Sequence, residues 1–182
     1  MSSEHDQSIE RPCLYLVATP IGNLGDITQR ALAVLRGVDF VCAEDTRTSM
    51  RLLDHYAIAR PMESLHERNE GARTTAIIDR ILRQREAVAV ISDAGTPLIS
   101  DPGYRLSRAA HASGIPVRSV PGASAALAGL TVSGMPVDRF TFEGFLPTRH
   151  AARIKRLSEL SNATQTLIFF EAPHRINAAL HD

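Results

Sequence analysis

The 182-residue sequence is poor in lysine and cysteine and has no net formal charge, and each scarcity excludes a class of protein. Lys155 is the single lysine among 20 basic residues. A P-loop enzyme, a Schiff-base enzyme or a kinase is therefore excluded unless Lys155 is its functional lysine. Cys13 and Cys42 lie in apolar runs without CxxC or histidine spacing, which excludes a disulfide framework and a zinc cluster. Residues 11–182 hold 20 basic and 17 acidic residues, an excess too small to indicate a nucleic-acid partner by itself.

The sequence also lacks a hydrophobic run that suits a membrane span. Its longest uncharged stretch, residues 119–137, contains two prolines, three glycines and three serines among mostly small residues, which argues against a transmembrane helix. The first ten residues hold three acidic residues and no lysine or arginine, the wrong charge for a signal or transit peptide. We therefore expect a cytoplasmic protein.

What the sequence does contain is an alternation of apolar runs with amphipathic stretches. The runs that predict strands are residues 13–19, 38–43, 87–92, 116–120, 140–146 and 166–172. Between them lie helix-like stretches such as residues 71–86, in which Ile77, Ile78, Ile81 and Leu82 form one apolar stripe. This alternation predicts an α/β fold with a parallel sheet covered by helices on both faces.

The order of these stretches predicts three parts of the chain. Residues 1–12 are expected to form a disordered tail, and residues 13–136 an N-terminal α/β domain. A glycine and proline break places the boundary near Pro136. Residues 137–182 hold at most two strands and two helices, so they are expected to be the beginning of a second α/β domain that is truncated.

Four of the predicted strands run directly into loops rich in glycine, proline and small polar residues. These loops are residues 19–26, 44–47, 92–103 and 121–126. In an open parallel sheet such loops gather at the carboxyl edge, where ligands bind. Glycines let backbone N–H groups approach a ligand, and Ser124 is expected to open a helix whose first N–H groups are free. The pattern predicts a pocket for a nucleotide-like cofactor, although each loop taken singly is equally explained by turn chemistry.

Asp93 and Asp101 bracket the longest loop and allow two interpretations. As a carboxylate pair they would hold Mg²⁺ in a nucleotide or phosphate enzyme. Alternatively, Asp101 caps a helix that begins at Pro102, and this reading is favoured by the capping preferences of aspartate and proline. Asp93 has no capping role of this kind.

The stretch PTRHAARIKR, residues 147–156, is rich in basic residues and has no acid. Its cations are Arg149, Arg153, Lys155 and Arg156, of which the three arginines share one helical face. The stretch is either a phosphate-contacting strip for RNA or an ordinary solvated helix face, and the residues do not distinguish the two. We call it the basic strip.

Six segments in their order and spacing resemble the ribosomal RNA small subunit methyltransferase I family, of the tetrapyrrole methylase class. They are LYLVATPIGNLGDIT, AEDTR, SDAGTPLISDPG, VPGASA, FEGFLP and FFEAPHR. The resemblance implies a tetrapyrrole-methylase-like fold, S-adenosylmethionine as cofactor, no metal, and a homodimer. It also implies methyl transfer to the ribose 2′-oxygen of a cytidine in 16S rRNA of the small ribosomal subunit. Family members continue beyond FFEAPHR, so a non-catalytic truncated binding module stays open as an alternative.

The resemblance also implies site residues. The expected cofactor-binding residues are Pro20, Ile21, Gly22, Asp93, Thr96, Ser124 and Ala125. A ribose hydroxyl is a poor nucleophile and benefits from a base. The candidates for that base are Glu171, His174 and His66, with Glu44 and Asp45 as further ones. An alternative for Glu171 is an ion pair with Arg175, four residues later.

Overall fold

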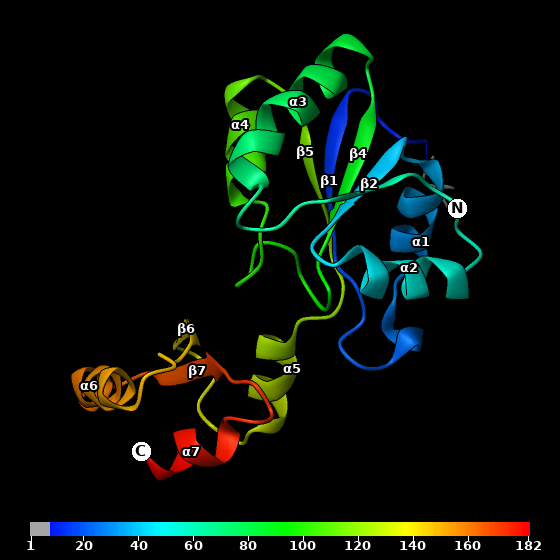
Figure 1. Cartoon of the computed structure of the whole chain (residues 1–182). Coiled ribbons are helices and arrows are strands. Elements are labelled where there is room, and N and C mark those ends of the chain that lie inside the picture. The colour runs from blue at the N-terminus through cyan, green and yellow to red at the C-terminus, as the bar shows by residue number, and fades with distance from the viewer. Residues whose placement is uncertain (1–7) are drawn as a thin grey trace. The chain divides into compact units, whose positions relative to one another are not determined.

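Strands and helices alternate along residues 8–182, which the computed structural model describes (Figure 1). The first part comprises β1 (Cys13–Val17), the 3₁₀ helix η1 (Leu24–Asp26), α1 (Gln29–Gly37), β2 (Phe40–Ala43), α2 (Thr46–His55), β3 (Met62–Ser64), α3 (Glu70–Arg83), β4 (Ala87–Ile91), α4 (Tyr104–Ala112) and β5 (Val117–Val120). The second part comprises α5 (Ala125–Val132), β6 (Phe140–Phe145), α6 (His150–Leu160), β7 (Thr166–Phe170) and α7 (Ile176–His181). The predicted α/β class is confirmed.

The first part is built on a parallel sheet with strand order β3-β2-β4-β1-β5. Every residue of β2 and β4 is buried, as expected for strands covered on both faces. The edge strand β3 was not predicted from the sequence, because Met62–Ser64 is short, half-buried and mostly polar. Since all strands are parallel, their carboxyl ends lie at one edge of the sheet.

Two helical layers cover the sheet, as Figure 1 shows. Helices α1 and α2 pack on the face formed by side chains such as Tyr15, Val41 and Ala89. Helices α3 and α4 pack on the opposite face, where Ile77 and Leu106 meet the neighbouring strand residues Leu14, Phe40 and Val88. The alternation of strand residues between the two faces follows from the two-residue period of a strand.

Two of the helices begin on side chains that cap them locally. Thr28 accepts the Ala31 N–H (3.0 Å) at the start of α1, and Asp45 accepts the Arg47 N–H (2.8 Å) at the start of α2. The prediction that Asp101 caps a helix from Pro102 is wrong. Helix α4 begins at Tyr104, because Gly103 adopts a left-handed conformation (φ 118°) and interrupts the helical path, and no side chain at its N-cap position bonds to it.

The part of the predicted disordered tail that the structure describes is ordered by contacts, so that prediction is wrong for residues 8–12. Ile9 packs against the core beside Gly37, where an added Cβ would lie 2.3 Å from Ile9 Cγ1. Glu10 pairs with Arg118 (2.8 Å) and Arg11 with Asp39 (3.1 Å). Residues 1–7 of the predicted tail lie outside the described residues.

The chain divides into two compact units between Ser124 and Ala125. We call residues 8–124 unit 1 and residues 125–182 unit 2. The division lies before the predicted boundary near Pro136, because α5 packs against β7. Unit 2 contains the parallel pair β6–β7, with a bulge between Phe142 and Gly144. Within residues 8–182, no helix combines the length and apolar character that crossing a bilayer requires.

Candidate functional site

The loops at the carboxyl edge of the unit 1 sheet are joined to one another by hydrogen bonds. Thr19, after β1, and Gly95, after β4, exchange both backbone bonds (2.9 and 3.1 Å). The Thr19 hydroxyl also donates to the Ser92 carbonyl (3.2 Å), and the Thr96 hydroxyl donates to the Ala123 carbonyl (3.2 Å). The sequence prediction that loops 19–26, 92–103 and 121–126 meet is therefore confirmed for their residues within unit 1.

Positive φ angles favour glycine at two of these positions, and close contacts also restrict one of them. Gly95 has a left-handed conformation (φ 81°), and a Cβ there would lie 3.2 Å from Ile21 Cγ2 and 3.6 Å from the Ala123 carbonyl. Gly22 is also in a positive-φ conformation (φ 134°), but a Cβ there would meet no atom within 4 Å. Gly22 therefore borders open space, while the neighbouring Pro20 is buried.

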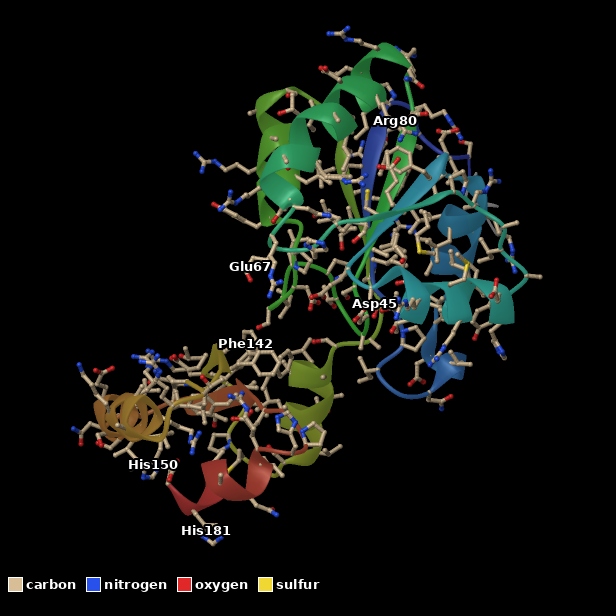
Figure 2. The ribbon with its side chains drawn as sticks, viewed as in Figure 1. Asp45, Glu67, Arg80, Phe142, His150 and His181 are labelled. Carbon is tan, nitrogen blue, oxygen red and sulfur yellow. The ribbon has the colours of Figure 1, made fainter. Side chains whose placement is uncertain are left out.

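A group of carboxylates lies at the same edge, where Asp45 follows β2 (Figure 2). Asp93 Oδ1 accepts the Asp45 N–H (3.1 Å), which joins loop 44–47 to loop 92–103. Desolvation by the surrounding protein raises the pKa of Glu44, Asp93 and Asp101. Repulsion from neighbouring acids raises two of these pKa values further. Asp101 and Asp93 raise the pKa of Glu44, and Asp93 raises the pKa of Asp101. We call Glu44, Asp93 and Asp101 the acidic trio.

Loop 92–103 holds strained backbone. Leu98 (φ 72°) and Ser100 (φ 65°) are both in the left-handed region, which costs a residue with a side chain about 1–3 kcal/mol. Such strain persists only where surrounding contacts over-determine the conformation, and it concentrates at functional sites.

His66 belongs to the same edge because of β3, the strand that the sequence did not reveal. It follows β3, and its backbone N–H donates to Asn69 Oδ1 (2.8 Å) in the turn that precedes α3. The side chain is half-buried. The turn 65–69 is thus a fifth loop at the carboxyl edge of the sheet.

In unit 2, Glu171 and His174 follow β7, and the structure gives them different surroundings. The Glu171 side chain is 5% exposed and its Oε1 accepts from Arg175 (2.5 Å) and from the Ala172 N–H (2.8 Å). The alternative that Glu171 pairs with Arg175 is therefore confirmed. His174 is exposed. Ser124 directly precedes α5, as predicted, and Ala125 is the first residue of that helix.

The basic strip lies on α6, but two of its four cations already hold carboxylates. Arg153 is 5% exposed and pairs with Asp182 (2.5 Å). Arg156 pairs with Glu143 (2.5 Å) and Glu159 (3.2 Å). These pairs compete with RNA contact by Arg153, which is also buried, and by Arg156, whose side chain is still 41% exposed. Arg149 and Lys155 remain exposed.

Glu70 is a residue of this edge that sequence reasoning missed. Its carboxylate accepts backbone N–H groups at the start of α4, some 35 residues away, as in the 2.7 Å bond from Arg105. No local pattern signals this contact, because Glu70 looks like an ordinary acid in the first turn of its own helix. Among residues 8–182, no group of three or more histidine, cysteine, aspartate or glutamate side chains is arranged to hold a metal ion.

Two solved structures share the fold of this chain. Diphthine synthase superposes with a TM-score of 0.69 at 17% identity, over 88% of this chain and 65% of that one. Uroporphyrin-III C-methyltransferase from Thermus thermophilus superposes with a TM-score of 0.54 at 22% identity, over 74% of this chain and 63% of that one. At these identities the likeness shows the fold alone.

Curated relatives are much closer in sequence. The ribosomal RNA small subunit methyltransferase I of Xylella fastidiosa is 55% identical over 93% of this chain, and that of Pseudomonas aeruginosa is 54% identical over 93%. The chain spans 62% and 60% of the length of these two proteins. Residues 13–182 match the model of the tetrapyrrole (corrin/porphyrin) methylases. The chain therefore belongs to the tetrapyrrole methylase family.

Proposed function

We propose that the protein is an S-adenosylmethionine-dependent methyltransferase that acts on the ribose 2′-oxygen of a cytidine in 16S rRNA. The observation that carries this proposal is the 54–55% identity, over 93% of the chain, to relatives named ribosomal RNA small subunit methyltransferase I. The joined loops of unit 1 support it, because they form a rigid edge of the kind at which doubly wound sheets bind nucleotides.

The residues of this edge suit S-adenosylmethionine in charge and leave the loops open to a ligand at Gly22. The open space beside Gly22 admits a ligand close to the backbone of loop 19–26. The acidic trio is complementary to the sulfonium and ammonium groups of the cofactor, since a nearby cation favours the ionised carboxylates that desolvation, and then repulsion between neighbouring acids, disfavour. We propose that Asp93 and the backbone of Pro20, Ile21 and Gly22 hold the cofactor.

Three further predicted cofactor contacts remain part of the proposal, with one refinement. The Thr96 hydroxyl donates to Ala123, so we expect Thr96 to shape the loops and to contact the cofactor through its backbone. Ser124 and Ala125 stand at the start of α5 and offer the N–H groups of its first turn.

The chain's part in the reaction is alignment and proton removal. S-adenosylmethionine supplies an activated methyl group on its sulfonium, and in-line displacement requires the accepting oxygen to be held on the line of the breaking bond. The hydrogen-bonded loops are suited to that task because they restrict the motion of every residue they carry.

For the base we retain Glu171, His174, His66, Glu44 and Asp45 as candidates, and the local surroundings favour Glu44 over Glu171. The pKa of Glu44 is raised by burial and by neighbouring acids, toward the range in which a carboxylate is an effective base. Glu171 Oε1 is already occupied by Arg175 and by a backbone N–H.

We further propose that the protein works in the cytoplasm as a homodimer and contacts the small ribosomal subunit. Arg149 and Lys155 are the exposed cations of the basic strip that remain for rRNA phosphates. These three points extend what the relatives' name and the family resemblance imply, and size-exclusion chromatography with light scattering tests the dimer.

The test is methyl transfer from labelled S-adenosylmethionine to small ribosomal subunits that lack the cytidine modification, with nuclease mapping of the product. A ribose methyl group on a 16S rRNA cytidine supports the proposal. Cofactor binding without transfer would favour the non-catalytic binding module. Calorimetry of S-adenosylmethionine binding in EDTA distinguishes the methyltransferase from a Mg²⁺ enzyme built on Asp93 and Asp101. The methyltransferase predicts that binding is retained, and the Mg²⁺ enzyme predicts that it is lost.

A further inference from the structure

Glu70 places a carboxylate where the first turn of α4 presents free backbone N–H groups. Its side chain is carried by the first residue of α3 and is 5% exposed. One oxygen, Oε1, accepts from the N–H groups of Gly103 (3.1 Å), Arg105 (2.7 Å) and Leu106 (3.1 Å). The N–H groups of a helix start carry partial positive charge, so a carboxylate is a strong acceptor for them.

These three N–H groups stand directly at the end of loop 92–103, whose backbone is strained. Leu98 and Ser100 hold left-handed conformations there, and a Cβ on Gly103 would lie 2.8 Å from Leu98 Cδ1. The near end of the loop is held by the Thr19–Gly95 backbone pair. Glu70 holds the far end, so the strained segment that carries Asp101 is anchored on both sides, and Asp93 lies two residues before its near anchor.

A helix cap alone does not require such a residue. Caps are ordinarily local, as Thr28 and Asp45 are for α1 and α2. Glu70 lies 33 positions before Gly103, and its own backbone N–H donates to the His66 carbonyl (2.9 Å). One residue therefore ties the turn 65–69 after β3 to the loop after β4.

We propose that Glu70 is a positioning residue of the cofactor site. It holds the far end of loop 92–103, and with it Asp101, in the conformation that binds S-adenosylmethionine, and it fixes the turn of His66 relative to that loop. This inference rests on the proposed function, and it concerns a residue that touches neither cofactor nor substrate.

The test compares Glu70→Ala and Glu70→Gln with two controls in the whole 182-residue chain. Glu67→Gln removes an exposed charge three residues earlier, in the turn before α3 (Figure 2). Ile77→Val trims a core side chain of the same helix, so it lowers stability without touching the loop. Calorimetry at a temperature where circular dichroism shows every variant folded gives the dissociation constant for S-adenosylmethionine.

We expect Glu70→Ala to weaken cofactor binding about tenfold or more, the loss that corresponds to about 1.4 kcal/mol. Glu70→Gln keeps an oxygen acceptor and is expected to restore most of the affinity. Both controls should bind S-adenosylmethionine with the parental affinity. This holds for Ile77→Val even if its melting temperature falls as far as that of Glu70→Ala. Equal affinities for Glu70→Ala and Ile77→Val at matched stability would reduce Glu70 to a helix cap.

A second readout separates this inference from the proposed function. Amide hydrogen exchange without any ligand should accelerate across loop 92–103 in Glu70→Ala and stay at the parental rate there in Ile77→Val. If Glu70→Ala accelerates amide exchange in loop 92–103 but the parent chain does not bind S-adenosylmethionine, the anchoring role of Glu70 is supported and the proposed function is refuted. Unchanged loop exchange would refute the anchoring. If Glu70→Ala does not fold, Glu70→Asp, whose shorter side chain cannot reach all three N–H groups, takes its place with the same expectations.

Discussion

Asp93 uses one of its two carboxylate oxygens to hold the loop after β2 through the Asp45 N–H. An amide at this position keeps an oxygen that can accept the same bond, so its structural role and its charge are separable by substitution. The charge matters for a cationic ligand, whereas the hydrogen bond matters for the loop.

We therefore predict that Asp93→Asn weakens S-adenosylmethionine binding by about tenfold, the scale of one lost charge-assisted contact. Thermal stability should stay within about 1 kcal/mol of the parent, because the bond to Asp45 survives. Calorimetry and thermal melts measure the two quantities. Asp54→Asn, at an exposed acid of α2, is the matched control, and equal affinity for both variants would remove Asp93 from the site.

The acidic trio makes cofactor binding depend on pH. Its pKa values are raised above the ordinary 3.8 of aspartate and 4.5 of glutamate, so the trio's contribution to folding stability is fully present below those values. That contribution is lost as the pH rises through the raised values, because ionisation places desolvated charges beside other acids.

Cofactor affinity should have the opposite dependence. A cationic ligand favours the ionised trio, so we predict that affinity rises as the pH rises from 3.8–4.5 through the raised pKa values and then levels off. Calorimetry in two buffers of different ionisation enthalpy should detect proton release over that range. A pH-independent affinity in the parent chain, or the same slope in Asp93→Asn/Asp101→Asn, would contradict this assignment.

The identity of the base is also decided at single residues. Glu44→Gln or His66→Ala is predicted to slow single-turnover methyl transfer by about 10²- to 10⁴-fold if that residue is the base, with cofactor affinity far less affected. Glu171→Gln should instead lower the stability of unit 2, because it breaks the buried pair with Arg175. If Glu171→Gln or His174→Ala instead slowed single-turnover methyl transfer strongly while keeping the parental stability, the substituted residue of unit 2 would be the base.

Among the elements, α6 carries basic residues of two kinds: some form ion pairs within unit 2 and others are exposed. Arg153 forms an ion pair with Asp182. Arg156 forms ion pairs with Glu143 of β6 and with Glu159 of α6. Arg149 and Lys155 stand exposed on the same helix or at its N-cap. The four cations therefore divide into two pairs with different expected effects.

We predict that Arg149→Gln/Lys155→Gln lowers the salt dependence of RNA binding by roughly 0.7 to 0.9 log units per lost contact and leaves stability unchanged. Arg153→Gln should lower the stability of unit 2, because the buried Arg153 side chain is then replaced by one that cannot form the ion pair with Asp182. Filter binding over a salt series and thermal melts check the two halves. A salt slope unaffected by the double substitution would make α6 a solvated face.

At the scale of the whole molecule, the two main apolar clusters both lie within unit 1. One lies between the sheet and α1–α2, and the other between the sheet and α3–α4. A sheet covered on both faces by its own helices has no further need of outside apolar surface.

Residues 8–124 alone are therefore predicted to fold. Expressed separately, they should give an α/β circular dichroism spectrum and one cooperative thermal transition. The same measurement on Ile81→Ala, which empties part of the core under α3, should lower the transition by the equivalent of about 2–5 kcal/mol. A broad, non-cooperative melt of the parental segment would show that unit 1 depends on unit 2.

Much of unit 1 was predictable because its signals are local. Apolar runs of four to six residues, helical stripes such as Ile77, Ile78 and Ile81, and the glycine-containing turns after β1, β4 and β5 are all properties of neighbouring residues. Together they predicted the parallel sheet and the gathering of loops at its carboxyl edge. Strand β3 was missed because three half-buried residues leave no periodicity to read.

Tertiary structure alone decided which polar groups are committed to the fold and which are left for a ligand. Glu70 reads as an ordinary first-turn acid until α4 lies beside it, and Arg153 reads as a surface cation until Asp182 covers it. The partners in these pairs are 35 and 29 positions apart. The sequence by itself determined which elements form and where their loops gather, because those depend on short-range periodicity and backbone preference. The availability of each charge depends on desolvation and on the partner across the contact, which only the packed chain supplies.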